Sequence, residues 1–93
     1  MGTITFTTST VITWASYEDQ MDNIEFDDLR SAKLTSMAEA GKTDGEAIIV
    51  TPTVTKRFFV DVAAAQEYID FLVTNAPQYG LTITSTEIQE NAI

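Results

Sequence analysis

The chain of 93 residues contains no cysteine and no histidine. Without cysteine it can form no disulfide, no thiolate nucleophile and no cysteine-based metal site. Without histidine it lacks the commonest general base and the commonest ligand of transition metals. These absences exclude the usual catalytic triads and zinc sites. We therefore expect no catalytic, cofactor-binding or metal-binding residues, and no cofactor.

Basic residues are scarce, since five lysines and arginines stand against fourteen acids, and the formal net charge is −9. A field of this sign repels nucleic-acid phosphates and anionic membrane surfaces. We therefore expect neither direct contact with nucleic acid nor binding to a membrane. The charge favours either solubility alone or a basic protein partner, and the composition leaves both interpretations open.

Long hydrophobic runs are also missing, and no stretch approaches the length of a membrane span. The first residues lack the basic region and apolar run of a signal peptide, and Phe6 stands where a myristoylation signal has serine or threonine. We expect a soluble, cytoplasmic protein. The apolar fraction of 44% argues against disorder, and the length predicts a single domain over residues 1–93.

The N-terminal part alternates in a way that is typical of a β-strand. Over residues 3–14 apolar or aromatic side chains alternate with threonine and serine, which predicts a strand. We favour one continuous strand over a hairpin folded at Thr7–Thr10, because no Asn-Gly or Asp-Gly pair is present to make a tight turn.

The first helix is predicted over residues 25–40, after a polar turn region at 15–24. Acids occupy its first turn, where the helix dipole favours negative charge, and Gly41 follows its end. Its predicted inner face consists of Phe26, Leu29, Lys33, Leu34, Met37 and Ala38.

Two strands follow a loop at residues 41–46. The nearly continuous apolar run 47–51 predicts a central strand that is buried on both faces. Pro52 marks its end, and 54–60 is the next strand. Because the connection is too short for a parallel crossover, the two strands should form an antiparallel hairpin.

The second helix is predicted over 62–75, with Asp61 as its N-cap and Pro77 as the residue that stops it. Its apolar stripe comprises Ala65, Tyr68, Ile69, Leu72 and Val73, and its outward residues are Gln66, Glu67 and Asp70. A last strand is expected at 81–88, followed by a frayed tail. The element order β-α-β-β-α-β predicts an α+β, ferredoxin-like fold: a four-stranded antiparallel sheet with two helices on one face.

Four strand aromatics raise the question of what covers the open face of this sheet. Phe6, Trp14, Phe58 and Phe59 exceed what one sheet face would bury under two short helices. Three interpretations remain: a place in the core or at its rim, a homo-oligomer interface, or a ligand cleft. For the second interpretation, these four residues are the interface candidates.

An acidic segment carries six carboxylates before the first base. Its spacing does not match the D-x-D-x-D-G calcium loop, and we predict no metal site there. It is either a solvated helix start or a surface that docks a basic protein or imitates a nucleic-acid backbone. The partner-binding candidates are Glu18, Asp19, Asp22, Asp27 and Asp28.

The remaining chemical candidates are isolated. Lys56 and Arg57 form the only adjacent basic pair, which either balances acids or binds an anion. Of the tyrosines that could donate a proton, Tyr17, Tyr68 and Tyr79, the second lies on the apolar stripe and is expected in the core. The loop GKTDG lacks the spacing of a phosphate-binding loop.

The segment 54–71 combines a strand ending in arginine and aromatics with an alanine-rich helix that carries aromatic-aliphatic pairs. In this it resembles small uncharacterised proteins of marine tailed phages, over residues 47–84. The resemblance is a pattern of fold elements and transfers no site residues. It implies a viral accessory or minor structural role in the cytoplasm of an infected bacterium.

Three functions are compatible with these observations. The leading hypothesis is a non-enzymatic protein-interaction module, homo-oligomeric, that binds a host or virion protein. The second is a small cofactor-independent enzyme or small-molecule binder of the dimeric ferredoxin-like type, which would need a pocket with polar groups such as Tyr68 or Arg57. The third is an acidic nucleic-acid mimic that inhibits a DNA-binding protein. Binding is favoured over catalysis.

Overall fold

A computed structural model describes residues 6–16 and 23–90 of the chain. Its elements follow the predicted order β-α-β-β-α-β, with one short 3-10 helix added before the last strand. They are β1 (Thr8–Trp14), α2 (Ile24–Glu39), β2 (Thr43–Thr51), β3 (Val54–Phe59), α3 (Val62–Asn75), η1 (Ala76–Tyr79) and β4 (Ile83–Glu90). The predicted ferredoxin-like α+β arrangement is therefore confirmed.

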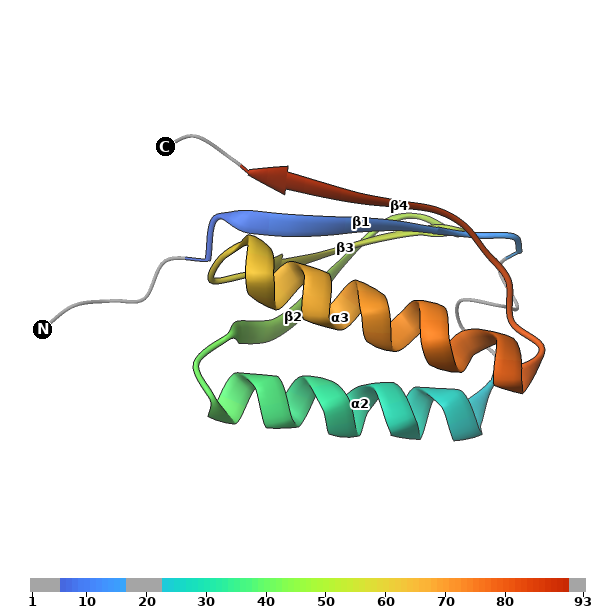
Figure 1. Cartoon of the computed structure of the whole chain (residues 1–93). Helices are drawn as coiled ribbons and strands as arrows, with labels where there is room; N and C mark the ends of the chain where they lie inside the picture. The colour runs from blue at the N-terminus through green and yellow to red at the C-terminus, as the bar shows by residue number, and fades with distance from the viewer. Residues whose placement is uncertain (1–5, 17–22, 91–93) are drawn as a thin grey trace, which may run out of the picture.

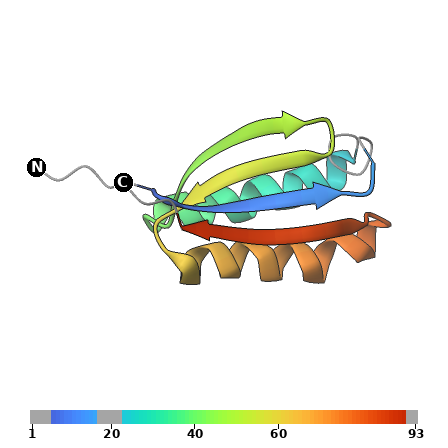
Figure 2. The same ribbon diagram turned by 90° about the horizontal axis from the view of Figure 1, so that it is seen from above.

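The four strands form one antiparallel sheet in the order β2-β3-β1-β4. Strands β3 and β1 occupy the centre, and β2 and β4 are the two edges. Both helices lie on the same side of this sheet (Figures 1 and 2). The opposite face is not covered by either described helix, and we call it the open face.

Strand β1 runs without a turn from Thr8 to Trp14, so the continuous strand is confirmed over the described residues and the hairpin at Thr7–Thr10 is wrong. The strand is shorter than predicted, because residues 6 and 7 precede it and residues 1–5 lie outside the described part. Ile12 and Trp14 point towards the helices and are buried, as the period of two along a strand requires.

Side-chain caps set the start of both helices. The Asn23 side chain accepts a hydrogen bond from the backbone N–H of Phe26 at 2.8 Å, and Asp61 accepts one from the N–H of Ala64 at 2.8 Å. Each bond satisfies a backbone donor that the first helical turn leaves without a partner. The predicted N-cap Asp61 is confirmed. Beyond α2, Gly41 has a φ of +74°, which favours glycine at this position.

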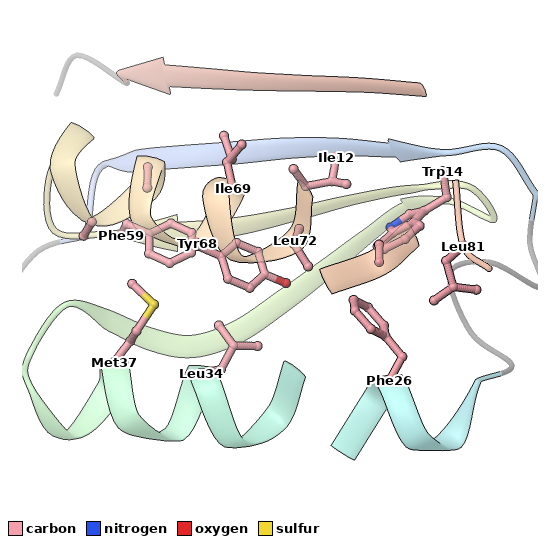
Figure 3. Packing of buried hydrophobic residues seen from close by; sticks show 13 residues of the cluster. Ile12, Trp14, Phe26, Leu34, Met37, Phe59, Tyr68, Ile69, Leu72 and Leu81 are labelled. Carbon is pink, nitrogen blue, oxygen red and sulfur yellow. The ribbon is translucent and has the colours of Figure 1, made fainter. Parts of the chain in front are cut away.

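The core lies between the helices and the sheet and is rich in aromatic side chains (Figure 3). The rings of Trp14 and Phe26 meet edge to face at 5.8 Å, which joins β1 to the first turn of α2. The rings of Phe59 and Tyr68 lie 5.3 Å apart and join β3 to α3. Such pairs add about 1 kcal/mol each beyond the burial of apolar area.

The prediction of a central, doubly buried strand at 47–51 is wrong. Strand β2 is an edge of the sheet, and Ile48, Ile49 and Val50 expose 49%, 53% and 54% of their surface. The apolar run indicated burial, but β3 pairs with both β1 and β2 and therefore takes the inner place. The strand also begins at Thr43, earlier than expected.

Three smaller expectations along the C-terminal part also change. Val73 was assigned to the apolar stripe of α3 but is 53% exposed, because it lies at the margin of that stripe. The α-helix does end at Asn75, but the chain continues into η1, which accommodates Pro77 in its first turn. Leu81 precedes β4 instead of beginning it, and it is buried in the core.

Adjacent phenylalanines on β3 provide a test of which sheet face the helices cover. Phe59 is completely buried, whereas Phe58 is partly exposed on the open face. We expect Phe59→Ala to lower the free energy of unfolding by about 3–5 kcal/mol, and Phe58→Ala by less than about 1.5 kcal/mol. Urea unfolding of both variants at low micromolar concentration measures the difference. Equal losses would contradict the assignment of the two faces.

Candidate functional site

The free edge of β2 carries three exposed large apolar residues in succession, Ile48, Ile49 and Val50. An edge strand presents unpaired backbone N–H and C=O groups, and natural proteins usually protect such edges with charges, prolines or bulges. The first half of β2 is protected in this way: it contains Asp44 and Glu46, and Gly45 has a φ of +78° within an irregularity of the ladder. From Ala47 to Thr51 the edge carries no charge.

The opposite edge of the sheet has a different chemistry. Strand β4 carries Thr84, Ser85, Thr86 and Glu87 in succession, all of them exposed. These hydroxyls and the carboxylate keep the β4 edge solvated and give a partner strand little apolar surface to bury. The two edges are therefore not equivalent, and the segment 47–51 is the one suited to pairing.

The open face also differs between its β2 side and its β4 side. Residues that are directly opposite in an antiparallel ladder share a face, and one such row crosses the sheet as Ile48, Lys56, Val11 and Glu87. The β2 end of the row is aliphatic and the β4 end is acidic. A second row places the ring of Phe58 on the β2 side of Ser9. The apolar part of the open face thus adjoins the exposed edge, and we call the two together the β2 surface.

The four strand aromatics fall into different places. Trp14 and Phe59 belong to the core, with 3% and 0% of their surface exposed, so neither is available as an interface residue of the folded chain. Both point to the helix side, where their rings contact those of Phe26 and Tyr68. Phe58 does lie on the open face, and Phe6 is half-buried ahead of β1.

The acidic partner-binding candidates are only partly described. Asp27 and Asp28 are exposed at the start of α2, whereas Glu18, Asp19 and Asp22 lie outside the described residues. Asp27 forms an ion pair with Arg30 at 2.7 Å, one helical turn along. Within the described ranges no group of three acids is arranged to hold a metal ion.

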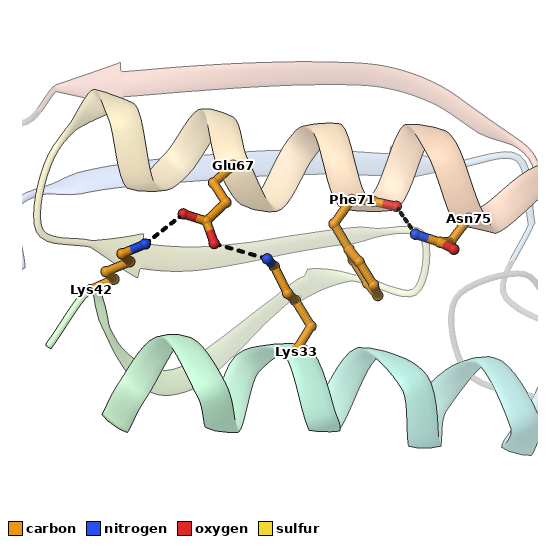
Figure 4. A network of polar contacts seen from close by, with 5 residues as sticks. All are labelled: Lys33, Lys42, Glu67, Phe71 and Asn75. Atoms are coloured by element: carbon orange, nitrogen blue, oxygen red, sulfur yellow. Dashed lines mark hydrogen bonds and ion pairs between the residues drawn. The ribbon is translucent and has the colours of Figure 1, made fainter. Parts of the chain in front are cut away.

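Glu67 takes a position that the helical pattern did not predict. It was assigned to the outward face of α3, but it lies between the helices and bridges two lysines (Figure 4). Its carboxylate oxygens accept hydrogen bonds from Lys33 of α2 and from Lys42, each at 2.8 Å. These bonds hold the pKa of the Glu67 carboxyl below its ordinary value. The bridge ties α3 to α2 through Lys33 and to the segment after α2 through Lys42.

Tyr68 is buried in the core, as predicted, and the guanidinium carbon of Arg57 lies 6.0 Å from the centroid of its ring. Burial raises the pKa of the Tyr68 hydroxyl, while the charges of Arg57 and Arg30 act in the opposite direction. The group therefore stays protonated at neutral pH. Tyr79 is half-buried and packs its ring 5.5 Å from that of Phe26, and Tyr17 lies outside the described residues.

Comparison with known proteins gives no assignment: no family model, no curated protein and no solved structure matches this chain. None of the described helices is long and apolar enough to cross a membrane. The fold and the surfaces described above therefore carry the functional argument.

Sequence reasoning missed the β2 surface and the bridge at Glu67 for different reasons. The apolar run 47–51 is visible in the sequence, but such a run fits either a buried strand or an exposed edge that binds a partner. For Glu67, no local signal existed, because Lys33 and Lys42 are 34 and 25 residues away along the chain.

The bridge predicts a pH-dependent contribution to stability. Because the pKa of Glu67 is lowered in the folded chain, its stabilising effect is present above the ordinary value of 4.5 and is lost as the pH falls through the folded pKa. We expect Glu67→Gln to lower the free energy of unfolding at pH 7 by about 0.5–1 kcal/mol at low salt. Urea unfolding at pH 7 and pH 3 should show that the difference from the unmodified chain disappears in acid.

The matched control is Asp70→Asn, on the same helix, where the carboxylate accepts a hydrogen bond from Gln66 and not from a lysine. It should leave the free energy of unfolding nearly unchanged at both pH values. A loss at Asp70 equal to that at Glu67, or a loss at Glu67 that persists at pH 3, would show that the bridge is not its source.

Proposed function

We propose that this protein is a non-enzymatic protein-interaction module that binds an extended strand of its partner along β2. The observation that supports this proposal is the uncharged edge at 47–51, with Ile48, Ile49 and Val50 each about half exposed. Strand addition satisfies the free backbone groups of an edge, and side chains on alternate faces provide selectivity. Burial of three β-branched side chains would add several kcal/mol of apolar transfer free energy.

The chemistry of the β2 surface defines the partner strand. The apolar residues of the partner strand would pack against Ile48 and Phe58 on the open face. Because the chain carries a net charge of −9, a partner with flanking lysines or arginines would be attracted over a longer range. The resemblance to small proteins of tailed phages makes a host or virion protein the expected source of such a strand.

A second copy of this chain is also a suitable partner, which agrees with the predicted homo-oligomer. If two β2 strands pair antiparallel about a two-fold axis at Ile49, each Ile48 lies opposite a Val50 of the other copy. The same register places Glu46 opposite Pro52, so that no two carboxylates of the strands face each other. This kind of self-complementary contact is what a symmetric dimer requires.

The other two functions have weaker support. The described carboxylates lie on or beside α2, β2, α3 and β4, and this distribution over four elements favours an interaction module over a mimic that displays one row of charges. For a cofactor-independent enzyme, Tyr68 would need access to a substrate, but its side chain is packed in the core.

The salt dependence of self-association tests the proposal. Two copies repel each other through their net charge, and salt screens this repulsion. By light scattering after size-exclusion chromatography, we expect more dimer in about 500 mM salt than in about 20 mM salt, where the Debye length is roughly three to five times longer. Ile48→Lys should remain a monomer in both, and Ser85→Lys should behave like the unmodified chain.

These two variants form a matched pair, because both residues lie on the open face, one on each edge strand. Affinity capture from a bacterial lysate with the same pair tests a foreign partner: its recovery should be lost with Ile48→Lys and kept with Ser85→Lys, and should fall with salt. If the unmodified chain stays monomeric in high salt and the two variants recover the same proteins, the proposal is wrong.

A further inference from the structure

A cleft of about 630 Å³ separates α2 from the edge strand β2 on the helix side of the sheet. Its helical wall includes Ser31, Thr35 and Ala38, its strand wall includes Gly45 and Ala47, and Arg57 of β3 reaches it from the sheet. It shares Ala47 with the β2 surface but opens on the face that carries the helices.

Small side chains make up much of both walls of the cleft. Ser31, Thr35 and Ala38 are spaced by four and three residues and therefore lie on one side of α2. Gly45 and Ala47 oppose them and contribute at most one methyl group each. Side chains of this size leave the space between helix and strand unfilled, whereas Leu34 and Met37 of the same helix pack into the core.

Arg57 is the one cationic residue of this cleft, and no described carboxylate forms an ion pair with it. Among the described residues, ion pairs join Arg30 to Asp27, and Lys33 and Lys42 to Glu67. Arg57 is half-buried, with its guanidinium carbon 6.0 Å from the centroid of the Tyr68 ring. A partly desolvated cation costs free energy unless an anion compensates it. Arg57 has no such partner among the described carboxylates, although acids outnumber bases fourteen to five in this chain.

The register of the sheet places the Arg57 side chain on the helix side. Arg57 is directly opposite Thr10 of β1 and Ala47 of β2, and Thr10 is fully buried on the helix side. The hydroxyl of Thr10 has no hydrogen-bond partner among the described residues. Lys56, the preceding residue, points to the open face, where it lies over the ring of Phe58. Of the basic pair, only Arg57 therefore serves the cleft.

We propose that this cleft is a binding site for a small aliphatic monocarboxylate. A guanidinium binds a carboxylate through two parallel hydrogen bonds, and the hydroxyls of Ser31 and Thr35 offer further donors. Leu34, Ala38 and Ala47 provide apolar surface for a short hydrocarbon body. Glu39 lies in the same cleft and disfavours a second negative charge, which selects a monocarboxylate over a dicarboxylate. This proposal does not rest on strand addition at β2.

Three probes of similar length separate the contributions of charge and apolar surface. In an amide NMR titration, butyrate should shift the signals of Thr35 and Ala47 in a saturable way, with a dissociation constant of about 1 mM. The neutral analogue 1-butanol should shift them little, and succinate should bind more weakly than butyrate. No saturable shift with butyrate, an equal response to 1-butanol, or tighter binding of succinate would overturn the proposal.

Neighbouring substitutions locate the charge that is responsible. Arg57→Gln should weaken butyrate binding at least about tenfold, because it removes a charged hydrogen-bond donor. Lys56→Gln changes the net charge by the same amount but on the opposite face, and should leave the dissociation constant within about twofold. If the two variants weaken binding equally, the effect is one of net charge and the proposal is wrong.

A third variant covers the case in which Arg57→Gln disturbs folding. Ala38 is exposed on α2, and leucine is a good helix former, so that Ala38→Leu should fill the cleft while it keeps Arg57 and the fold. We expect a dispersed amide spectrum like that of the unmodified chain and loss of butyrate binding by at least about tenfold. Undiminished binding by folded Ala38→Leu would show that butyrate does not occupy this cleft.

Discussion

The antiparallel pairing of β3 with β1 is the interaction on which the rest of the structure depends. In its register Ile12 lies opposite Thr55 and Thr8 lies opposite Phe59. A shift by one residue would exchange the faces of every side chain on β3. Phe59 would then leave the core and Phe58 would enter it, while Arg57 would move to the open face. The core, the open face and the cleft therefore share one geometric origin.

The same pairing explains why β2 is exposed. Because β3 occupies the place beside β1, the strand that follows α2 can only join the sheet at its free side. Helix α3 packs against β1, β3 and β4, whereas α2 packs mainly against β2. The outer edge of β2 pairs with no described strand, and a cleft remains between β2 and α2.

The basic residues of the described chain differ in whether they form ion pairs. Lys33 and Lys42 both form ion pairs with Glu67, and Arg30 forms one with Asp27. The two bases of β3 form no ion pair with a described carboxylate, and the sheet separates them, one to each face. In a strongly acidic chain, Lys56 and Arg57 are therefore the described bases whose charge is left for a partner or a ligand. Both proposals use this region, since one places a partner strand along β2 and the other places a carboxylate beside Arg57.

Much of the fold could be predicted from local patterns. Asp61, with an alanine-rich stretch behind it, predicted a helix whose bounds are those observed, because capping and helical spacing are local properties. Alternation around Ile12 and Trp14 predicted the first strand. Long-range partners could not be predicted in this way. The apolar run at 48–50 fits a buried strand as well as an edge. The position of Glu67 between the helices depends on Lys33 and Lys42, which are far away along the chain.

The sequence by itself determined the element order, the caps, the absence of thiol and imidazole chemistry, and the strong negative charge. Each of these follows from residue identity and from spacing along the chain. Only the tertiary structure decided which strand lies at the edge, which aromatic of the pair Phe58 and Phe59 enters the core, and that Arg57 faces a cleft. These outcomes depend on strand order and register, which are set by contacts between residues far apart in the chain.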